Sequence, residues 1–434
     1  MARVVAAEIP KGRVLEKVAC VSDATQTYAL YIPTSFDPAK KSAVLFCFDP
    51  GARGKNPVER FQEAAEKFGY IVAGSNNSRN GPWDANAAAI KAMVGDVTKH
   101  LPIDPKRIYV AGLSGGARVA CQIAMGGLAQ GVIACSAAFS GSETPGKVPF
   151  LFFGTAGVTD FNYRELKRVD RELDDRKATH RVVIFDGGHE WLPPPLALEA
   201  LAWIELQAMR RGTREKDEPW IVAQFEARRA GVPAAAGLER MRALRSLAAD
   251  FKGVAEIGAL EKEAAALAAT RDVRDALRTE RDAMSKEDAL AEKLLAAVSD
   301  GFVDSARKTA TELQAKAKTS ADPAERAMAV RVLQGVSSSC SEAARSAMRA
   351  NDYETAVPLL EMVAVLRPER TQGHIELARA RALLGDKKQA IAALEAAVAA
   401  GFKDAARLEQ EKDFEKLRKE PAFAALLARL KTGG

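Results

Sequence analysis

The sequence predicts an α/β protein: a doubly wound, mostly parallel sheet with helices on both faces, followed by a second, all-helical domain. Short apolar runs alternate with amphipathic helical stretches up to about residue 212. After the charged segment 210–219 the strand-like runs stop, and Ala, Leu, Glu, Arg and Lys dominate the remainder. The length of 434 residues also exceeds what one hydrophobic core usually serves, which favours two or more domains.

Seven runs in the first part are expected to form strands, and several are apolar throughout, as strands covered on both faces should be. They are residues 28–32, 43–48, 70–73, 107–111, 132–137, 149–154 and 180–185. The helical patterns between and after them are residues 57–68, 86–100, 116–125, 163–174 and 194–209. Strands that alternate with helices indicate βαβ units and a parallel sheet. We therefore place an α/β domain at residues 1–212.

Residues 213–434 are expected to be helical, and their C-terminal part contains an internal repeat. Asp352 and Asp386 are 34 residues apart, and each begins a turn followed by a small residue four positions later and an apolar one eight positions later. This helix-turn-helix period resembles tetratricopeptide repeats over about residues 338–404. His374 and Cys340 stand where the first helix of such a repeat usually has a large aromatic residue. The resemblance implies a protein partner or self-association.

Composition and charge argue against several other classes of protein. The net charge of +6 is spread along the chain without a long basic block, so we expect no nucleic-acid binding. No apolar stretch is long enough to span a membrane. The first residues, MARVVAAEIPKGR, lack the apolar core of a signal peptide. The compartment stays unknown, with the cytoplasm as the default and export open if a signal was removed.

The cysteines do not indicate a metal site. There are five, an odd number, and their spacings match no metal-binding motif. We therefore expect no metal.

A serine lies between a predicted strand and a predicted helix in residues 107–125. Ser114 is the centre of Gly-Leu-Ser-Gly-Gly, residues 112–116. In a G-x-S-x-G turn the glycines let the backbone fold tightly, and the serine hydroxyl stands exposed above the sheet. The helix N-terminus adds positive potential where an oxyanion would form. We predict that Ser114 is a nucleophile; the alternative is an ordinary serine in a tight turn.

A serine nucleophile needs a base, and in this architecture the chain order should be serine, acid, histidine. His189 follows the last predicted strand after two glycines, which place it on a loop at the C-terminal edge of the sheet. The other three histidines fit less well, because they precede the serine, open a strand, or lie in the repeat region. These are His100, His180 and His374. His189 is therefore the predicted base.

The acid that orients the histidine should follow the strand at residues 149–154. Asp160 lies there, six residues beyond the end of that strand, at the sheet edge where such folds bind ligands. Asp186 is too close to His189 in sequence for a good orienting hydrogen bond. Asp170 and Asp174 fall in a charged helix and are expected to be solvated. Asp160 is therefore the predicted acid.

Together these segments resemble those of α/β-hydrolases over residues 1 to about 210. The resemblance is nearest to the esterase branch that includes polyhydroxybutyrate-depolymerase-like and feruloyl-esterase-like proteins. It is carried by residues 112–116, by Phe-Phe-Gly-Thr-Ala-Gly-Val-Thr-Asp ending at Asp160, and by Gly-Gly-His-Glu-Trp around His189. It implies a serine-dependent carboxylic ester hydrolase that acts through an acyl-serine intermediate, without a metal or organic cofactor. A small-molecule or oligomeric ester is the implied substrate.

In that family two backbone N–H groups bind the oxyanion. The first belongs to the residue after the serine, which is Gly115 here. The second comes from the loop after the third strand, which departs in this chain from the usual His-Gly and contains Pro50, a residue without an N–H. We expect Gly51 to be the second donor, with Asp49 or Ala52 as alternatives.

Several polar and aromatic residues of the loops are expected to contact a substrate. Arg53 is suited to pair with an anionic group of the substrate. Trp191, which lies near His189 in the sequence, is suited to form a wall of the pocket. The remaining candidates follow the strand at residues 70–73, and they are Asn76, Asn77, Arg79 and Trp83.

Two other functions stay open on the sequence alone. The protein is an interaction scaffold if the repeats recruit a partner and the hydrolase domain is degenerate, and the unusual loop after the third strand favours this. The same serine, acid and histidine would also serve a peptidase or an acyltransferase.

Overall fold

The chain forms two compact units, Met1–Arg281 and Asp282–Gly434, and each is described by itself. The computed structural model describes residues 10–141, 144–299 and 303–432. The expectation that a signal peptide is missing concerns the first residues, of which 1–9 lie outside the described part.

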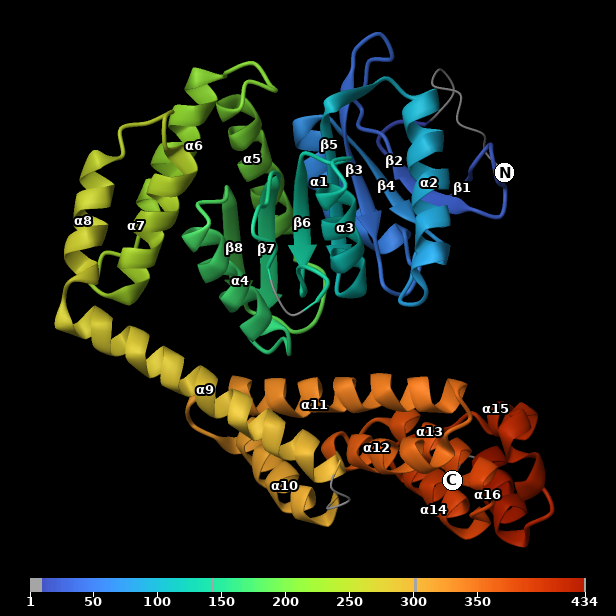
Figure 1. Cartoon of the computed structure of the whole chain (residues 1–434). Helices are drawn as coiled ribbons and strands as arrows, with labels where there is room; N and C mark the ends of the chain where they lie inside the picture. Colours follow the sequence, from blue (N-terminus) through green and yellow to red (C-terminus); the bar gives the residue numbers. More distant parts are fainter. Residues whose placement is uncertain (1–9, 142–143, 300–302, 433–434) are drawn as a thin grey trace. The chain divides into compact units, whose positions relative to one another are not determined.

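The first unit is built on one eight-stranded sheet with the order β1-β2-β4-β3-β5-β6-β7-β8 (Figure 1). The strands are β1 (Val14–Ala19), β2 (Thr27–Tyr31), β3 (Ser42–Phe48), β4 (Tyr70–Ser75), β5 (Ile103–Leu113), β6 (Gly131–Cys135), β7 (Leu151–Gly157) and β8 (His180–Phe185). The pairs β1–β2 and β2–β4 are antiparallel, and the remaining pairs are parallel. This confirms the mostly parallel sheet expected from the sequence.

Helices cover both faces of the sheet. One face carries α2 (Trp83–His100), α3 (Gly115–Met125) and α4 (Tyr163–Asp175), and the other carries α1 (Lys55–Phe68) and α5 (Pro194–Arg210). In β3, Val44 and Phe46 belong to the first core and Leu45 and Cys47 to the second. Because side chains alternate along a strand, a strand between two layers of helices is apolar at every position.

Strand β1 was not predicted. Its Glu16 and Lys17 are exposed and interrupt the apolar pattern, and an irregularity between Leu15 and Val18 breaks the two-residue alternation. β1 lies at the edge of the sheet, where burial constrains the sequence less.

Three helices after the sheet extend the first unit beyond the predicted boundary at residue 212. They are α6 (Glu218–Ala230), α7 (Leu238–Phe251) and α8 (Gly258–Ala268). Leu206 and Met209 of α5 share an apolar core with residues of these helices. Trp203 Nε1 also donates to the buried Asp250 Oδ1 at 2.6 Å. These contacts keep the three helices with the sheet, so the division between compact units falls at residue 281.

The second unit is helical in the part that the structure describes, which confirms the all-helical expectation. Its elements are the end of α9 (Arg271–Ser299), then α10 (Val303–Thr319), α11 (Pro323–Arg349), α12 (Tyr353–Leu366), α13 (Thr371–Leu384), α14 (Lys387–Ala399), α15 (Ala405–Gln410), η1 (Lys412–Leu417) and α16 (Pro421–Lys431). Asp352 and Asp386 cap α12 and α14 in the same way, each accepting a backbone N–H three residues on. α11 has 27 residues and α13 has 14, so the two helical pairs are unequal. The likeness to tetratricopeptide repeats stays a prediction.

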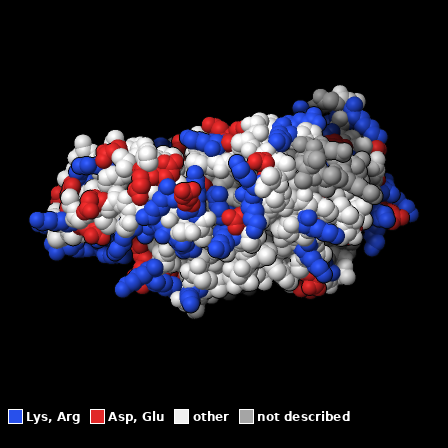
Figure 2. Space-filling model, turned by 90° about the horizontal axis from the view of Figure 1, so that it is seen from above, with Lys and Arg blue, Asp and Glu red and all other residues white. Residues whose placement is uncertain are grey.

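Figure 2 shows one face of the molecule, on which basic and acidic side chains are interspersed with uncharged ones. In the described ranges, no helix combines the length and apolarity that a membrane span needs. The same residues contain no group of three or more His, Cys, Asp or Glu side chains placed to hold a metal ion.

His180 links β8 to α4. Its buried ring has Nδ1 3.0 Å from the Ala178 carbonyl oxygen and Nε2 3.3 Å from Asp170 Oδ1. Burial by itself opposes the charged ring. The Asp170 carboxylate and the Ala178 carbonyl outweigh it, so the pKa of His180 lies above its ordinary value.

We expect His180→Gln to lower the free energy of unfolding more at about pH 5.5 than at about pH 8.5. A histidine with a raised pKa in the folded state contributes stability that is fully present below its unfolded pKa, about 6.5. That contribution is lost as the pH rises through the folded-state pKa. Urea unfolding followed by tryptophan fluorescence measures the free energy of unfolding of the first unit, because all four tryptophans lie in that unit. Asp170→Asn should remove most of the pH difference, and an equal loss at both pH values would contradict the assignment.

Candidate active site

Ser114 occupies the corner between β5 and α3. Its backbone has φ 54° and ψ −121°, a conformation that a residue with a side chain seldom adopts. The Ser114 N–H donates to the Cys135 carbonyl at 2.8 Å, and the Ser114 carbonyl accepts from Ala117 N at 2.9 Å and Arg118 N at 3.2 Å. These bonds hold the strained residue between the neighbouring strand and its own helix.

The glycines on either side of Ser114 are required by close backbone packing. A Cβ atom on Gly112 would lie 2.0 Å from the Gly116 carbonyl oxygen. A Cβ atom on Gly116 would lie 2.0 Å from the Phe48 carbonyl oxygen. α3 therefore starts directly against the ends of β3 and β5, at a distance that leaves no room for side chains.

The predicted acid and base are in contact. His189 Nδ1 lies 2.8 Å from Asp160 Oδ1, and the Asp160 side chain is fully buried. The same oxygen accepts the Asn162 N–H at 2.8 Å, and the Phe161 ring stacks on the imidazole with 4.0 Å between ring centroids. With Nδ1–H donating to the carboxylate, the lone pair of a neutral ring is on Nε2. The ring is therefore fixed in both orientation and tautomer.

Close backbone contacts join the loops that carry these two residues. A Cβ atom on Gly157 would lie 2.3 Å from the Gly187 carbonyl oxygen. Thr159 donates to that same oxygen twice, from its N–H at 3.0 Å and from its hydroxyl at 2.8 Å. The loop after β7 and the loop after β8 thereby become one structure, which sets Asp160 beside His189.

The segment after β8 continues across the C-terminal edge of the sheet. At the end of β6, the Ser136 hydroxyl donates to the Glu190 carbonyl at 3.2 Å. Beyond the end of β3, Trp191 Nε1 donates to Asp49 Oδ2 at 2.9 Å. Because β5 lies between β3 and β6, this path runs over the strand that ends directly before Ser114.

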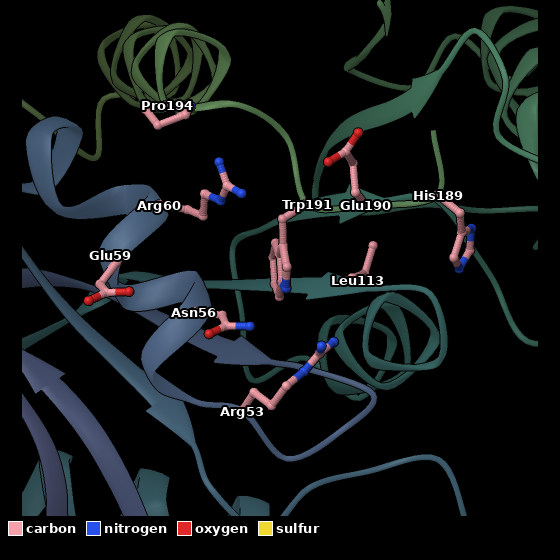
Figure 3. A pocket seen from close by; sticks show the side chains of 9 residues that line it. All are labelled: Arg53, Asn56, Glu59, Arg60, Leu113, His189, Glu190, Trp191 and Pro194. Atoms are coloured by element: carbon pink, nitrogen blue, oxygen red, sulfur yellow. The ribbon is translucent and has the colours of Figure 1, made fainter. Parts of the chain in front are cut away.

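Ser114 and His189 share this edge of the sheet. Leu113, the residue before the serine, and His189 line one cavity (Figure 3). Within the described residues, no hydrogen bond joins the Ser114 hydroxyl to the imidazole. In free enzymes such contacts are often long and tighten only when substrate binds. The structure thus joins Asp160 directly to His189 and brings Ser114 to the same edge.

The two expected oxyanion donors differ in their availability. Gly115 is the first residue of α3, so its N–H has no partner within the helix and lies at the positive end of the helix dipole. Gly51 donates its N–H to Asp49 Oδ1 at 2.8 Å, and the alternative, Ala52, donates to the Asp49 carbonyl at 3.1 Å. Contrary to our expectation, the Gly51 N–H is engaged, because the short loop closes on the Asp49 carboxylate.

Asp49 organises this loop, although the sequence suggested it only as a backbone donor. Its fully buried carboxylate accepts from Gly51 N, from Arg53 Nε at 2.8 Å and Nη2 at 3.2 Å, and from Trp191 Nε1. Trp191 is 142 residues away in sequence, so no local pattern could show this convergence.

Asn80 was missed by the sequence reasoning, which singled out other residues of the same segment. A Cβ atom on Gly115 would lie 1.9 Å from Asn80 Oδ1, so the Asn80 amide fills the space of a side chain at position 115. The Asn80 N–H donates to the Pro50 carbonyl at 2.9 Å, which fixes the residue beside the loop after β3. Only this pairing of two loops distinguishes Asn80 from its neighbours.

The cavity next to His189 has a volume of about 540 Å³ (Figure 3). It is lined by Arg53, Asn56, Glu59, Arg60, Leu113, His189, Glu190, Trp191 and Pro194. Arg53 and Trp191, two of the expected substrate contacts, are among these residues. Trp83, a third, is 42% exposed at the start of α2 and does not line this cavity.

The amides of Asn76 and Asn77 are engaged with the β1–β2 hairpin, contrary to the expected substrate contact. Asn76 Nδ2 donates to the Glu16 carbonyl at 3.1 Å and to Thr27 Oγ1 at 3.3 Å. Asn77 Oδ1 accepts the Thr27 N–H at 2.8 Å, and Asn77 Nδ2 donates to the Thr25 carbonyl at 3.2 Å. Both amides therefore fix the hairpin against the end of β4.

Comparison with known proteins gives solved structures that are similar to part of this chain, and three of them cover 41% to 46% of it. No protein-family model matches this chain, and no curated protein matches it. The fluorophosphonate-binding serine hydrolase F of Staphylococcus aureus is 13% identical, with 41% of this chain and 92% of that chain covered and a TM-score of 0.34. A ferulic acid esterase is 16% identical (44% and 96% covered, TM-score 0.37). An esterase of Pyrobaculum calidifontis is 13% identical (46% and 87% covered, TM-score 0.38). These similar structures are esterases and serine hydrolases, but the identities and TM-scores are too low to carry a function across.

Proposed function

We propose that this protein is a serine hydrolase that cleaves carboxylic esters through an acyl-serine intermediate. One observation carries the proposal: a buried carboxylate, Asp160, holds His189 by a 2.8 Å hydrogen bond at the sheet edge where Ser114 occupies a strained corner. A serine displayed on a strand-to-helix turn, with a carboxylate-bound histidine after a later strand, is the arrangement that acyl transfer requires.

The first step is attack by the serine hydroxyl. His189 Nε2 takes the proton of Ser114 Oγ as the oxygen adds to the ester carbonyl carbon. The ring then carries a positive charge, which the ionised Asp160 stabilises through its hydrogen bond with Nδ1. Burial of the carboxylate strengthens this interaction, because little water screens it.

Two donors would stabilise the negative oxygen of the tetrahedral intermediate. Gly115 supplies its free N–H at the N-terminus of α3. For the second donor we choose the side-chain amide of Asn80 in place of the engaged Gly51. A half-turn about the last bond of Asn80 places Nδ2 where Oδ1 lies, against Gly115.

The remaining steps return the enzyme to its starting state. His189 gives its proton to the departing alkoxide, which leaves as the alcohol, and Ser114 keeps the acyl group. A water molecule, deprotonated by His189, then attacks the acyl-serine, and the acid is released with Ser114 protonated again.

We expect a fluorophosphonate probe to label the wild-type chain at Ser114, and Ser114→Ala to abolish the labelling. The probe reacts only with a serine whose hydroxyl is activated by a base. Peptide mapping by mass spectrometry identifies the modified residue. Ser35→Ala, which removes an exposed hydroxyl, is the matched control and should label normally. A wild-type chain that is not labelled would overturn the proposed hydrolase activity and favour the interaction scaffold. Activity measured in parallel on ester and peptide substrates separates an esterase from a peptidase.

We expect Asp160→Asn to lower kcat for p-nitrophenyl butyrate by about 10³- to 10⁴-fold, with a smaller change in KM. The amide cannot hold the imidazole in the required tautomer or stabilise its charged form. Asp186→Asn is the matched control, because Asp186 is an exposed aspartate only three residues before His189. An equal loss of kcat in both variants would rule out Asp160 as the orienting acid.

A further inference from the structure

We propose that the cavity beside His189 binds a negatively charged group of the substrate, with Arg60 as the main cation. This inference rests on the proposed function and adds the substrate class: an ester that carries a carboxylate in its acyl part or in its alcohol part. The observation is a pair of arginines from two elements that border the cavity next to the proposed base.

Arg60 supplies the uncompensated charge. It belongs to α1, its side chain is half-buried, and it makes no ion pair with any residue in the ranges 10–141, 144–299 and 303–432. A partly buried guanidinium loses hydration without gaining a partner, which is unfavourable unless an anion binds there. Figure 3 shows Arg60 extending from α1 into the space beside Trp191.

Arg53 and Asn56 add directional donors on the other side of the cavity. Asp49 engages only Nε and Nη2 of Arg53, and a guanidinium carries five N–H donors. The Arg53 side chain is 56% exposed, so its remaining donors are accessible to a ligand. Asn56 lies between the two arginines in Figure 3. A carboxylate in this place would find charge from one arginine and hydrogen bonds from the other.

Neither of the two glutamates that line the cavity forms an ion pair with Arg60 in the described part of the chain. Glu59 forms an ion pair with Lys55, with 3.6 Å between Oε1 and Nζ. Glu190 Oε1 accepts the Gly188 N–H at 3.1 Å. Among the described residues Arg60 has no carboxylate partner, whereas Arg53 is paired with Asp49, so Arg60 is the cation of this cavity whose charge an anionic ligand would balance.

The size and the wall of the cavity fit a short organic anion. A volume of about 540 Å³ is within the usual range for small-molecule sites. Trp191 is held in place by Asp49 and by an edge-on contact with Phe61, 6.4 Å between ring centroids. Its rigid indole offers an apolar surface for methylene groups or an aromatic ring between the ester and the anion.

The full chain is tested with two pairs of esters that differ mainly in one carboxylate. p-Nitrophenyl hydrogen glutarate and p-nitrophenyl pentanoate place the charge on the acyl side. 4-Acetoxybenzoate and phenyl acetate place it on the alcohol side. We expect the wild-type chain to have a higher kcat/KM for the charged ester in one of these pairs.

Arg60→Gln should reduce that preference about tenfold or more, because a hydrogen-bonded charge pair is lost. Arg60→Lys should retain part of it. Lys67→Gln is the matched control, because Lys67 is an exposed cation at the other end of α1 and does not line the cavity. This control should keep the wild-type preference. Thermal unfolding of each variant checks that it is folded.

The failure of this inference is distinct from the failure of the proposed function. A wild-type chain that labels at Ser114 but shows no preference for the charged esters overturns the anion site alone. An Arg60→Gln variant whose kcat/KM falls equally for charged and uncharged esters also overturns the anion site. If no ester is cleaved, calorimetry with glutarate and 4-hydroxybenzoate still tests the cavity. Binding weakened about tenfold by Arg60→Gln supports the site, and no binding to the wild-type chain overturns it.

Discussion

The rest of the site depends on the hydrogen bonds that the buried carboxylate of Asp49 accepts. An ionised group without water is costly unless its oxygens are fully hydrogen-bonded, and here one backbone N–H, one guanidinium and one indole surround it. The backbone N–H belongs to the loop after β3, the guanidinium to Arg53, and the indole to Trp191 in the segment that also carries His189. The Asp49 carboxylate thereby fixes the conformation of the loop, holds Arg53 at the cavity and holds Trp191 in the cavity wall.

Backbone contacts too close for any side chain complete this arrangement. Gly112 and Gly116 let α3 begin against the sheet, and Gly157 with Gly187 merges two loops. The strain at Ser114 persists because the strand before it and the helix after it are both held by the core, so relaxing the turn would disturb either one. A rigid sheet edge can therefore hold the proposed nucleophile, the proposed base and the proposed anion site.

The proposed chemistry is confined to residues of the first compact unit, and the apolar core that joins α5 to the following helices explains why this unit extends past the sheet. The strands of this unit were predictable because they are covered on both faces and so are apolar at each position. β1 was not, since an exposed edge strand with charged residues resembles a loop. In the second unit, the repeated aspartate caps are local features, and the 34-residue spacing was visible from the sequence for that reason.

The sequence by itself determined the alternation of strands and helices and the candidates Ser114, Asp160 and His189, because each follows a strand within a few residues and local patterns reveal such positions. Only the tertiary structure decided which loop groups are free and which are engaged. The Gly51 N–H and the amides of Asn76 and Asn77 are used within the fold. Asp49, Asn80 and Arg60 acquire importance from neighbours distant in sequence. A contact across the sheet edge depends on strand order and loop path, and neither is encoded in residue spacing along the chain.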